Sequence, residues 1–184
     1  MGFNLEEIKA NLNFGGARPT LFECIVATRY GNLAGGNKFR FTCKAASLPA
    51  SEINTIDLFY KGRPIKLAGD RPAFPDWEVT VYNDEDFSVR NTFEEWLSAM
   101  NEHEGNIIGR GVTANPNSYK SDAYVTQYGK AGNILKQIKF YGLFPRSLGP
   151  IGLDWDNANQ IETFTVSMAF DYWGASGGTT DIGA

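Results

Sequence analysis

Long hydrophobic runs, excess basic charge and histidine are all scarce in this chain of 184 residues. No apolar stretch approaches the ~20 residues that a membrane-spanning helix needs, so the sequence predicts no membrane anchor. The 17 Lys and Arg residues are outnumbered by 21 Asp and Glu residues, which gives a formal net charge of −4. This balance does not indicate the basic surface of a nucleic-acid-binding protein.

Groups that perform catalysis are equally sparse. His103, the single histidine, lies in the polar stretch NEHEGN and lacks the second histidine of the H-E-x-x-H zinc motif. The chain has neither a phosphate-binding G-x-x-x-x-G-K-[ST] loop nor a G-x-S-x-G nucleophile motif. The sequence therefore predicts that the protein is not an enzyme and that it has no catalytic residue, no metal and no cofactor.

The chain has only two cysteines, Cys24 and Cys43, and they are too far apart for a zinc site of the C-x-x-C type. Each lies in a segment that reads as a strand, at 20–29 and at 38–45. We expect these strands to form a hairpin with the two cysteines opposite each other. Two buried, reduced thiols are the favoured interpretation, and a cross-strand disulfide is the alternative.

Further strands are predicted from alternating polar and apolar residues. One strand is expected at 76–83, a hairpin at 121–128 and 134–144, and a last strand at 161–173. The last strand has one large apolar face and one small polar face, which includes Thr163, Thr165 and Ser167. Gly-rich residues 174–184 are predicted to be a flexible tail after a single domain at 1–173.

Two helices are expected among these strands. A short one is predicted at 4–13, and a longer amphipathic one follows the acidic cluster at 83–86. A lone helix cannot bury such an apolar face, so it should lie across a sheet. The predicted fold class is therefore mainly β (α+β), an antiparallel sandwich or partial barrel with one flanking helix. The apolar positions of the longer helix recur at helical spacing, and they are Val89, Phe93, Trp96, Leu97 and Met100.

The segment 46–75 combines four prolines with many apolar side chains. A solvated connection of this length would seldom carry so much apolar surface, so we expect an extended arm or hairpin. The arm either folds back onto its own core or packs on another subunit, and its composition leaves both open. The residues that would make the contact between subunits are Ile53, Ile56, Leu58, Phe59, Tyr60 and Arg63.

Four segments, in order, resemble the tail tube proteins of T-even-type contractile bacteriophages. The first two are FTCKAASLPA and KLAGDRPAFPDWEVTVYNDEDFSVRNTFEEW, and the last two are KSDAYVTQYGKAGNILKQIKFYGLFP and LGPIGLDWDNANQIETFTVSMAFDYW. Each motif is weak alone, whereas four in the family's order are specific. The chain departs from the family pattern in its longer N-terminal region, in a glycine-rich turn at 31–37 and in its Gly-rich end.

This resemblance implies six subunits per ring, with rings stacked into a tube that conducts double-stranded DNA during ejection. Strands of every subunit would join one ring-wide β-barrel, and Thr163, Thr165 and Ser167 are its candidate lumen lining. The implied partners are other copies of the chain, a tail sheath protein, and baseplate and tape-measure proteins. The implied location is the virion tail, assembled in the host bacterial cytoplasm.

Two other functions remain open at this point. The first is the tube of a secretion or injection machine, such as a type VI system, which would carry proteins instead of DNA. The second is a monomeric carbohydrate- or nucleic-acid-binding β domain, in which the strand aromatics would serve as a stacking platform.

Overall fold

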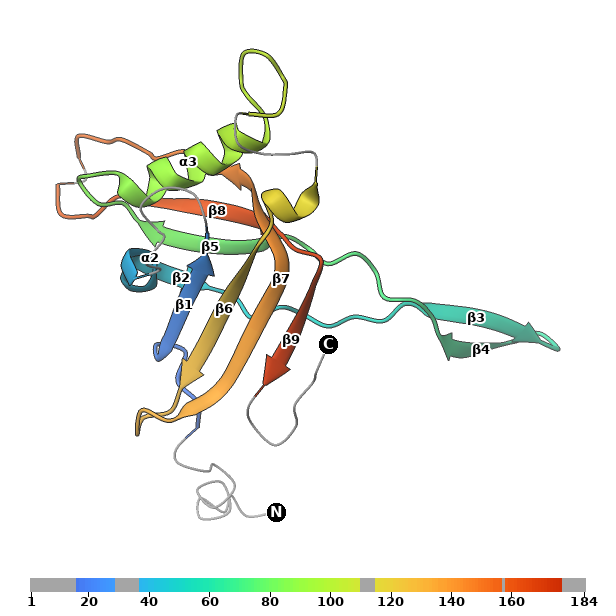
Figure 1. Cartoon of the computed structure of the whole chain (residues 1–184). Helices are drawn as coiled ribbons and strands as arrows, with labels where there is room; N and C mark the ends of the chain where they lie inside the picture. Colours follow the sequence, from blue (N-terminus) through green and yellow to red (C-terminus); the bar gives the residue numbers. More distant parts are fainter. Residues whose placement is uncertain (1–15, 29–36, 110–114, 157, 177–184) are drawn as a thin grey trace.

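The structure is a computed structural model that describes residues 16–28, 37–109, 115–156 and 158–176. The helix predicted at 4–13 lies outside these residues. The described elements run along the chain in the order shown in Figure 1. They are β1 (Phe22–Ala27), α2 (Asn37–Thr42), β2 (Cys43–Ala46), β3 (Thr55–Tyr60), β4 (Arg63–Ala68), β5 (Trp77–Tyr82), α3 (Ser88–Met100), a 3₁₀ turn (Pro116–Ser118), β6 (Ser121–Tyr128), β7 (Ile134–Leu148), β8 (Thr163–Ala169) and β9 (Tyr172–Ser176).

One long strand, β7, joins two antiparallel half-sheets. Its first part pairs with β6 and β9, and β6 pairs in turn with β1; we call these strands the β6 half-sheet. Its last part pairs with β8, followed by β5 and β2; we call these strands the β8 half-sheet. The predicted class is confirmed, because the fold is mostly antiparallel β with one main helix, and the described strands do not close into a barrel.

The strand β7 changes direction near Gly142, where it passes from one half-sheet to the other. Gly142 has φ +66°, and a Cβ there would lie 2.1 Å from a carboxylate oxygen of Asp171. Glycine alone combines this backbone conformation with the space that the Asp171 side chain requires. Asp171 also pairs with Lys120 at 2.7 Å, which ties the β8–β9 connection to the start of β6.

The core lies between the half-sheets and beneath the helix α3. Trp77 of β5 stacks on Phe140 of β7 with ring centroids 4.4 Å apart, which joins the two half-sheets. On α3, Val89, Phe93 and Trp96 are buried, whereas Leu97 and Met100 are partly exposed. Phe93 packs edge-on against Phe39 of α2 at 5.8 Å. The helix is therefore anchored through its first three turns.

The helix α3 begins later than the acidic cluster suggested. It starts at Ser88, and Phe87 precedes it in a left-handed conformation with φ 52° and ψ 16°. No acidic residue lies in its first turn, so the acidic cluster lies before the helix rather than within it. The side chain of Asp86 instead accepts a hydrogen bond from the backbone N of Ser88 at 3.0 Å.

The hairpin predicted between 20–29 and 38–45 is wrong. β1 pairs with β6, so that Cys24 lies opposite Val125, and β2 pairs with β5, so that Cys43 lies opposite Val81. Most of the second predicted strand forms the helix α2, because Phe39 packs against α3 rather than along a sheet. Both cysteines are free thiols. Their side chains still form a hydrogen bond with each other. This hydrogen bond is the largest cause that raises the pKa of Cys24, and burial of the thiol is the second.

The last predicted strand, 161–173, is two strands in the structure. β8 ends at Ala169, and β9 (Tyr172–Ser176) pairs with β7 in the other half-sheet. Residues 174–176 therefore belong to a strand, and the start of the tail was predicted three residues too early. Residues 177–184 lie outside the described part of the chain.

Replacing Phe93 by Ala should lower the free energy of unfolding by about 3–5 kcal/mol, because the ring is fully buried. Urea unfolding followed by tryptophan fluorescence measures the loss. Glu95→Ala on the exposed side of the same helix is the control and should change it by less than about 0.5 kcal/mol. Equal midpoints for the two variants would contradict the packing described for α3.

Candidate assembly interface

A two-stranded hairpin, β3 and β4, projects from the body of the molecule (Figure 1). Its strands join through Lys61 and Gly62, whose φ angles of 48° and 83° are those of a tight two-residue hairpin turn. The hairpin base is held by backbone hydrogen bonds between Gly69 and Asn54 at 2.7 Å and between Asn54 and Asp70 at 3.0 Å. The exposed hairpin, which is the central part of the predicted arm, therefore does not fold back onto the core.

The arm hairpin has one aliphatic face and one more polar face. Strand register places Ile56 opposite Leu67 and Leu58 opposite Ile65, so these four side chains share a face. All residues of both strands are exposed, and Phe59 on the other face is 72% exposed. Ile53 and Tyr60 are also exposed, and Arg63 lies directly opposite Tyr60. An isolated hairpin with this much exposed apolar surface is typical of an interface.

The two segments that connect the hairpin to the body line a small cavity of about 200 Å³. Its lining residues are Ser47–Ala50, Phe74–Trp77 and Phe170. The Trp77 indole donates a hydrogen bond to the Ser47 carbonyl at 2.9 Å, and Phe74 stacks on Phe170 at 5.4 Å. These contacts fix the direction in which the two connecting segments leave the core.

The candidate lumen residues lie together on the outward face of the β8 half-sheet. Thr163, Thr165 and Ser167 pair with Tyr82, Thr80 and Glu78 of β5. Thr165 is exposed, and the other two are partly buried. The Ser167 hydroxyl donates to Asp76 at 3.2 Å, and Asp76 also pairs with Arg146 at 2.9 Å.

This half-sheet also has two open edges. β2 pairs only with β5 among the described strands. Residues 144–148 of β7 pair with β8 on one side, whereas β6, which lies on the other side of β7, reaches only Leu143. Open strand edges carry unpaired backbone donors and acceptors, which another chain can satisfy.

The outward face of the β6 half-sheet differs, because it is aromatic and charged. Tyr141 stacks on Tyr172 at 4.6 Å, and the Lys139 ammonium lies 4.4 Å from the Tyr141 ring centroid. Lys139 also pairs with Asp122 at 3.0 Å, and the hydrogen bond that it donates to the Asp122 carboxylate raises the pKa of Lys139. The positive charge of Lys139 is therefore balanced by the carboxylate of Asp122.

Metal-binding side chains are not brought together among the residues that the structure describes. In the described part of the chain, no three His, Cys, Asp or Glu side chains are placed to hold a metal ion, and His103 is exposed. Asp154 accepts a hydrogen bond from the backbone N of Asp156 at 3.0 Å, as expected of a turn-forming carboxylate. None of the described helices is long and apolar enough to cross a bilayer.

Comparisons with known proteins agree with these features. The family model described as phage tail tube protein matches residues 12–176. The tail tube protein gp19 of Enterobacteria phage T4 is 41% identical over 158 residues, which cover 85% of this chain and 90% of that protein. The tail tube protein of Serratia phage KSP90 is 25% identical over 140 residues, covering 74% and 76% of the two chains.

Solved structures show the same fold in other contractile machines. A chain from the sheath/tube terminator of the extracellular contractile injection system PVC has a TM-score of 0.61 and 15% identity, covering 86% of this chain and 95% of that chain. A chain from the PVC sheath-tube complex has a TM-score of 0.59 and 15% identity, covering 96% and 99%. At these identities the likeness concerns the fold.

Lys38 bridges α2 to the acidic turn before α3, contacting Asp86 and lying 3.0 Å from Asp84. The hydrogen bond from Lys38, with a second from the Ser88 backbone, lowers the pKa of Asp86 to about 2. Because the folded-state pKa lies below the ordinary value of about 3.9, the stabilisation is complete above that value. It is lost as the pH falls through about 2.

Substitution of Lys38 by Met should move the pKa of Asp86 up toward its ordinary value. Carboxyl-detected NMR titration measures this shift, and Lys136→Met in the β6 half-sheet is the control. An unchanged pKa of Asp86 in the Lys38 variant would contradict the ion pair.

Proposed function

Because the chain belongs to the phage tail tube protein family, we propose that six copies form a ring and that rings stack into a channel for double-stranded DNA. Tail tube proteins are structural components of contractile phage tails, so this chain is a virion protein and not an enzyme. The single observation that carries the proposal is the arm hairpin, which exposes an aliphatic face that one copy cannot bury.

Ring closure would follow from the two open edges of the β8 half-sheet. Its strands run in the order β7, β8, β5, β2, and every neighbouring pair is antiparallel. β2 therefore runs opposite to β7, so β2 of one copy can pair antiparallel with residues 144–148 of the next. The two edges are different surfaces, and such a head-to-tail contact closes into a ring when the rotation per copy is suitable.

The outward face of the β8 half-sheet would then line the lumen. Its two central strands, β5 and β8, contain no Lys or Arg. A ring of six copies at −4 each would carry a net charge of −24. Lys44 of β2 lies over the Tyr82 ring and Arg146 of β7 pairs with Asp76, so cations are found at the edges of this face and not on its central strands. DNA phosphates are held mainly by Lys and Arg, so central strands that lack them would bind DNA only weakly.

The phage relatives favour DNA over protein as the cargo. Relatives at 41% and 40% identity are tail tube proteins of phages T4 and T6. The injection-system structures share 15% identity with this chain, so a secretion or injection tube has support only from the fold. A monomeric ligand-binding domain does not agree with the family to which the chain belongs.

Partners in the tail would surround this tube. The solved neighbours include a sheath-tube complex and a baseplate. We extend these contacts to the present chain, with a sheath protein outside the tube, a baseplate at one end and a tape-measure protein in the lumen. Assembly would take place in the host cytoplasm and end in the virion tail.

Replacing Leu58 and Ile65 together by Ser should abolish tube formation, because the two face each other on the aliphatic side of the arm. Negative-stain microscopy of the concentrated protein measures tube formation. Leu58 and Ile65 are 53% and 46% exposed on the projecting hairpin, so the thermal midpoint should not change. Asp57→Ser on the opposite face is the control and should assemble. Normal tubes from the double variant would contradict the role of the arm.

A Thr165→Arg substitution should slow DNA ejection, because it would place a ring of cations against the phosphates in the lumen. The measurement is the rate of DNA release from virions triggered in vitro. Asn91→Arg adds the same charge on an exposed part of α3 and is the matched control. Ejection at the same rate in both variants would contradict the lumen assignment, provided that both form tubes.

A further inference from the structure

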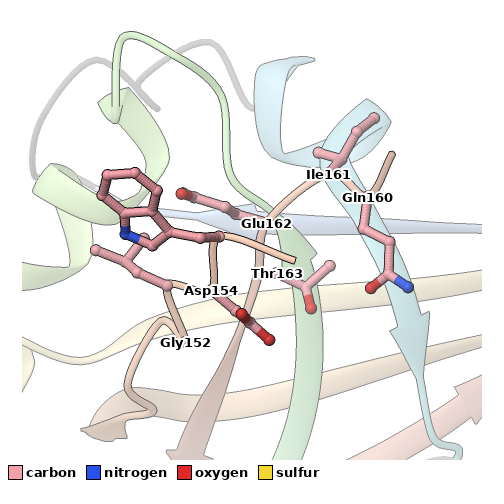
Figure 2. A pocket seen from close by; sticks show the side chains of 8 residues that line it. Gly152, Asp154, Gln160, Ile161, Glu162 and Thr163 are labelled. Atoms are coloured by element: carbon pink, nitrogen blue, oxygen red, sulfur yellow. The ribbon is translucent and has the colours of Figure 1, made fainter. Parts of the chain in front are cut away.

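We propose that a pocket at the opposite end of the β8 half-sheet receives the arm hairpin of a copy in the adjacent ring. This inference rests on the stacking proposed above and names the surface that the arm contacts. The far-end pocket is lined by Gly152–Trp155 and Gln160–Thr163 and has a volume of about 420 Å³. Figure 2 shows its two sides, with Gly152 and Asp154 on one and Gln160 and Ile161 on the other.

The topology separates the arm from this pocket by the whole length of the half-sheet. The arm returns to the body at Trp77, the first residue of β5, and β5 then runs to Tyr82. Tyr82 pairs with Thr163, which lines the pocket. The arm and the pocket therefore lie at opposite ends of the same strands, as Figure 1 shows for the β3–β4 hairpin and the loop before β8.

The pocket exposes large apolar side chains that the fold of one copy does not use. Trp155 is fully exposed at 101%, Leu153 is 82% exposed and Ile161 is 69% exposed. Tryptophan is enriched among the few residues that carry most of the binding energy of protein interfaces. Its natural counterpart is the aliphatic face of the arm hairpin, formed by Ile56, Leu58, Ile65 and Leu67.

The charges of the two surfaces are complementary. Residues 55–68 of the arm contain Lys61, Arg63 and Lys66 against one acidic residue, Asp57, so their net charge is 3 − 1 = +2. The pocket lining contains two acidic residues, Asp154 and Glu162, and no basic one, so its net charge is −2. Opposite charges steer such surfaces together and fix their register.

A contact between opposite ends explains how stacking would continue without limit. The arm and the pocket are different surfaces of the same chain, so the contact of one pair leaves a free pocket at one end and a free arm at the other. Head-to-tail contacts of this kind propagate into open filaments. The second copy would therefore cover the aliphatic face of the arm hairpin and the exposed side chains of Leu153, Trp155 and Ile161 at once.

The first test is Trp155→Ala in the full chain. We expect the extent of tube formation at a given protein concentration to fall about tenfold or more, as for an interface hot spot. The thermal midpoint of the subunit should not change, because Trp155 contacts little of its own chain. Ile134→Ala, exposed at the start of β7, is the control and should assemble as the wild type does.

The second test mixes two defective proteins. Trp155→Ala retains a functional arm, and the Leu58→Ser/Ile65→Ser variant retains a functional pocket. Sedimentation of the mixture should detect assemblies larger than either variant forms alone, because one kind of arm–pocket contact is restored. A mixture that sediments like its two components would overturn the proposal. The substitutions in the arm and in the pocket would then not affect one and the same contact.

The outcomes separate this inference from the function on which it rests. A wild-type protein that forms no tubes would overturn the proposed function itself. Tubes that form equally well with Trp155→Ala overturn only the pocket as the site of the arm. If those tubes then fail to assemble into sheathed tails, the pocket serves another tail protein, and the inference is likewise overturned.

Discussion

The arrangement of this protein depends on apolar surface and strand edges that one copy cannot cover. The arm hairpin β3–β4 stands away from the core with its aliphatic side chains in water. Among the described strands, the β8 half-sheet ends in the open outer edge of β2 on one side and in residues 144–148 of β7 on the other. Burial of apolar side chains contributes about 25 cal/mol per Å², so a second copy gains stability by covering such surface. The same features would be liabilities in a lone soluble protein.

The rigid body makes these contacts directional. Trp77 and Phe140 join the half-sheets, and α3 is fixed on them through Phe93 and Trp96. Trp77 also donates to the carbonyl of Ser47, so the residue that packs the core holds the root of the arm. The position of the arm is thereby tied to the half-sheet that carries both open edges. Ring closure and stacking would then share one scaffold, which is how a small subunit can build a long tube of constant width.

Several parts of this structure could be read from the sequence, and others could not. The helix α3 and the β6–β7 hairpin were predictable, because their periodicity is long and their partners are close in sequence. Residues 38–45 were wrongly predicted to be a strand. A stretch this short that alternates in polarity also fits a helix, and Phe39 packs against Phe93 of α3. The pairing of β1 with β6 spans about a hundred residues, and no local pattern encodes it. The projecting arm was predicted from its composition, and the lumen role of Thr163, Thr165 and Ser167 stays a prediction. Trp155 was overlooked because its surroundings resembled an ordinary turn.

Hydrogen–deuterium exchange of the arm tests the central claim most directly, because it reads the backbone of residues 55–68 in the free subunit and in the tube. The account predicts rapid exchange across both strands in dilute protein, where a lone hairpin opens readily, and strong protection after assembly. Residues 43–46 of β2 should gain protection in the same transition. Equal protection of residues 55–68 in the free subunit and in the tube would show that one copy already protects the backbone of the arm. This result would contradict the account.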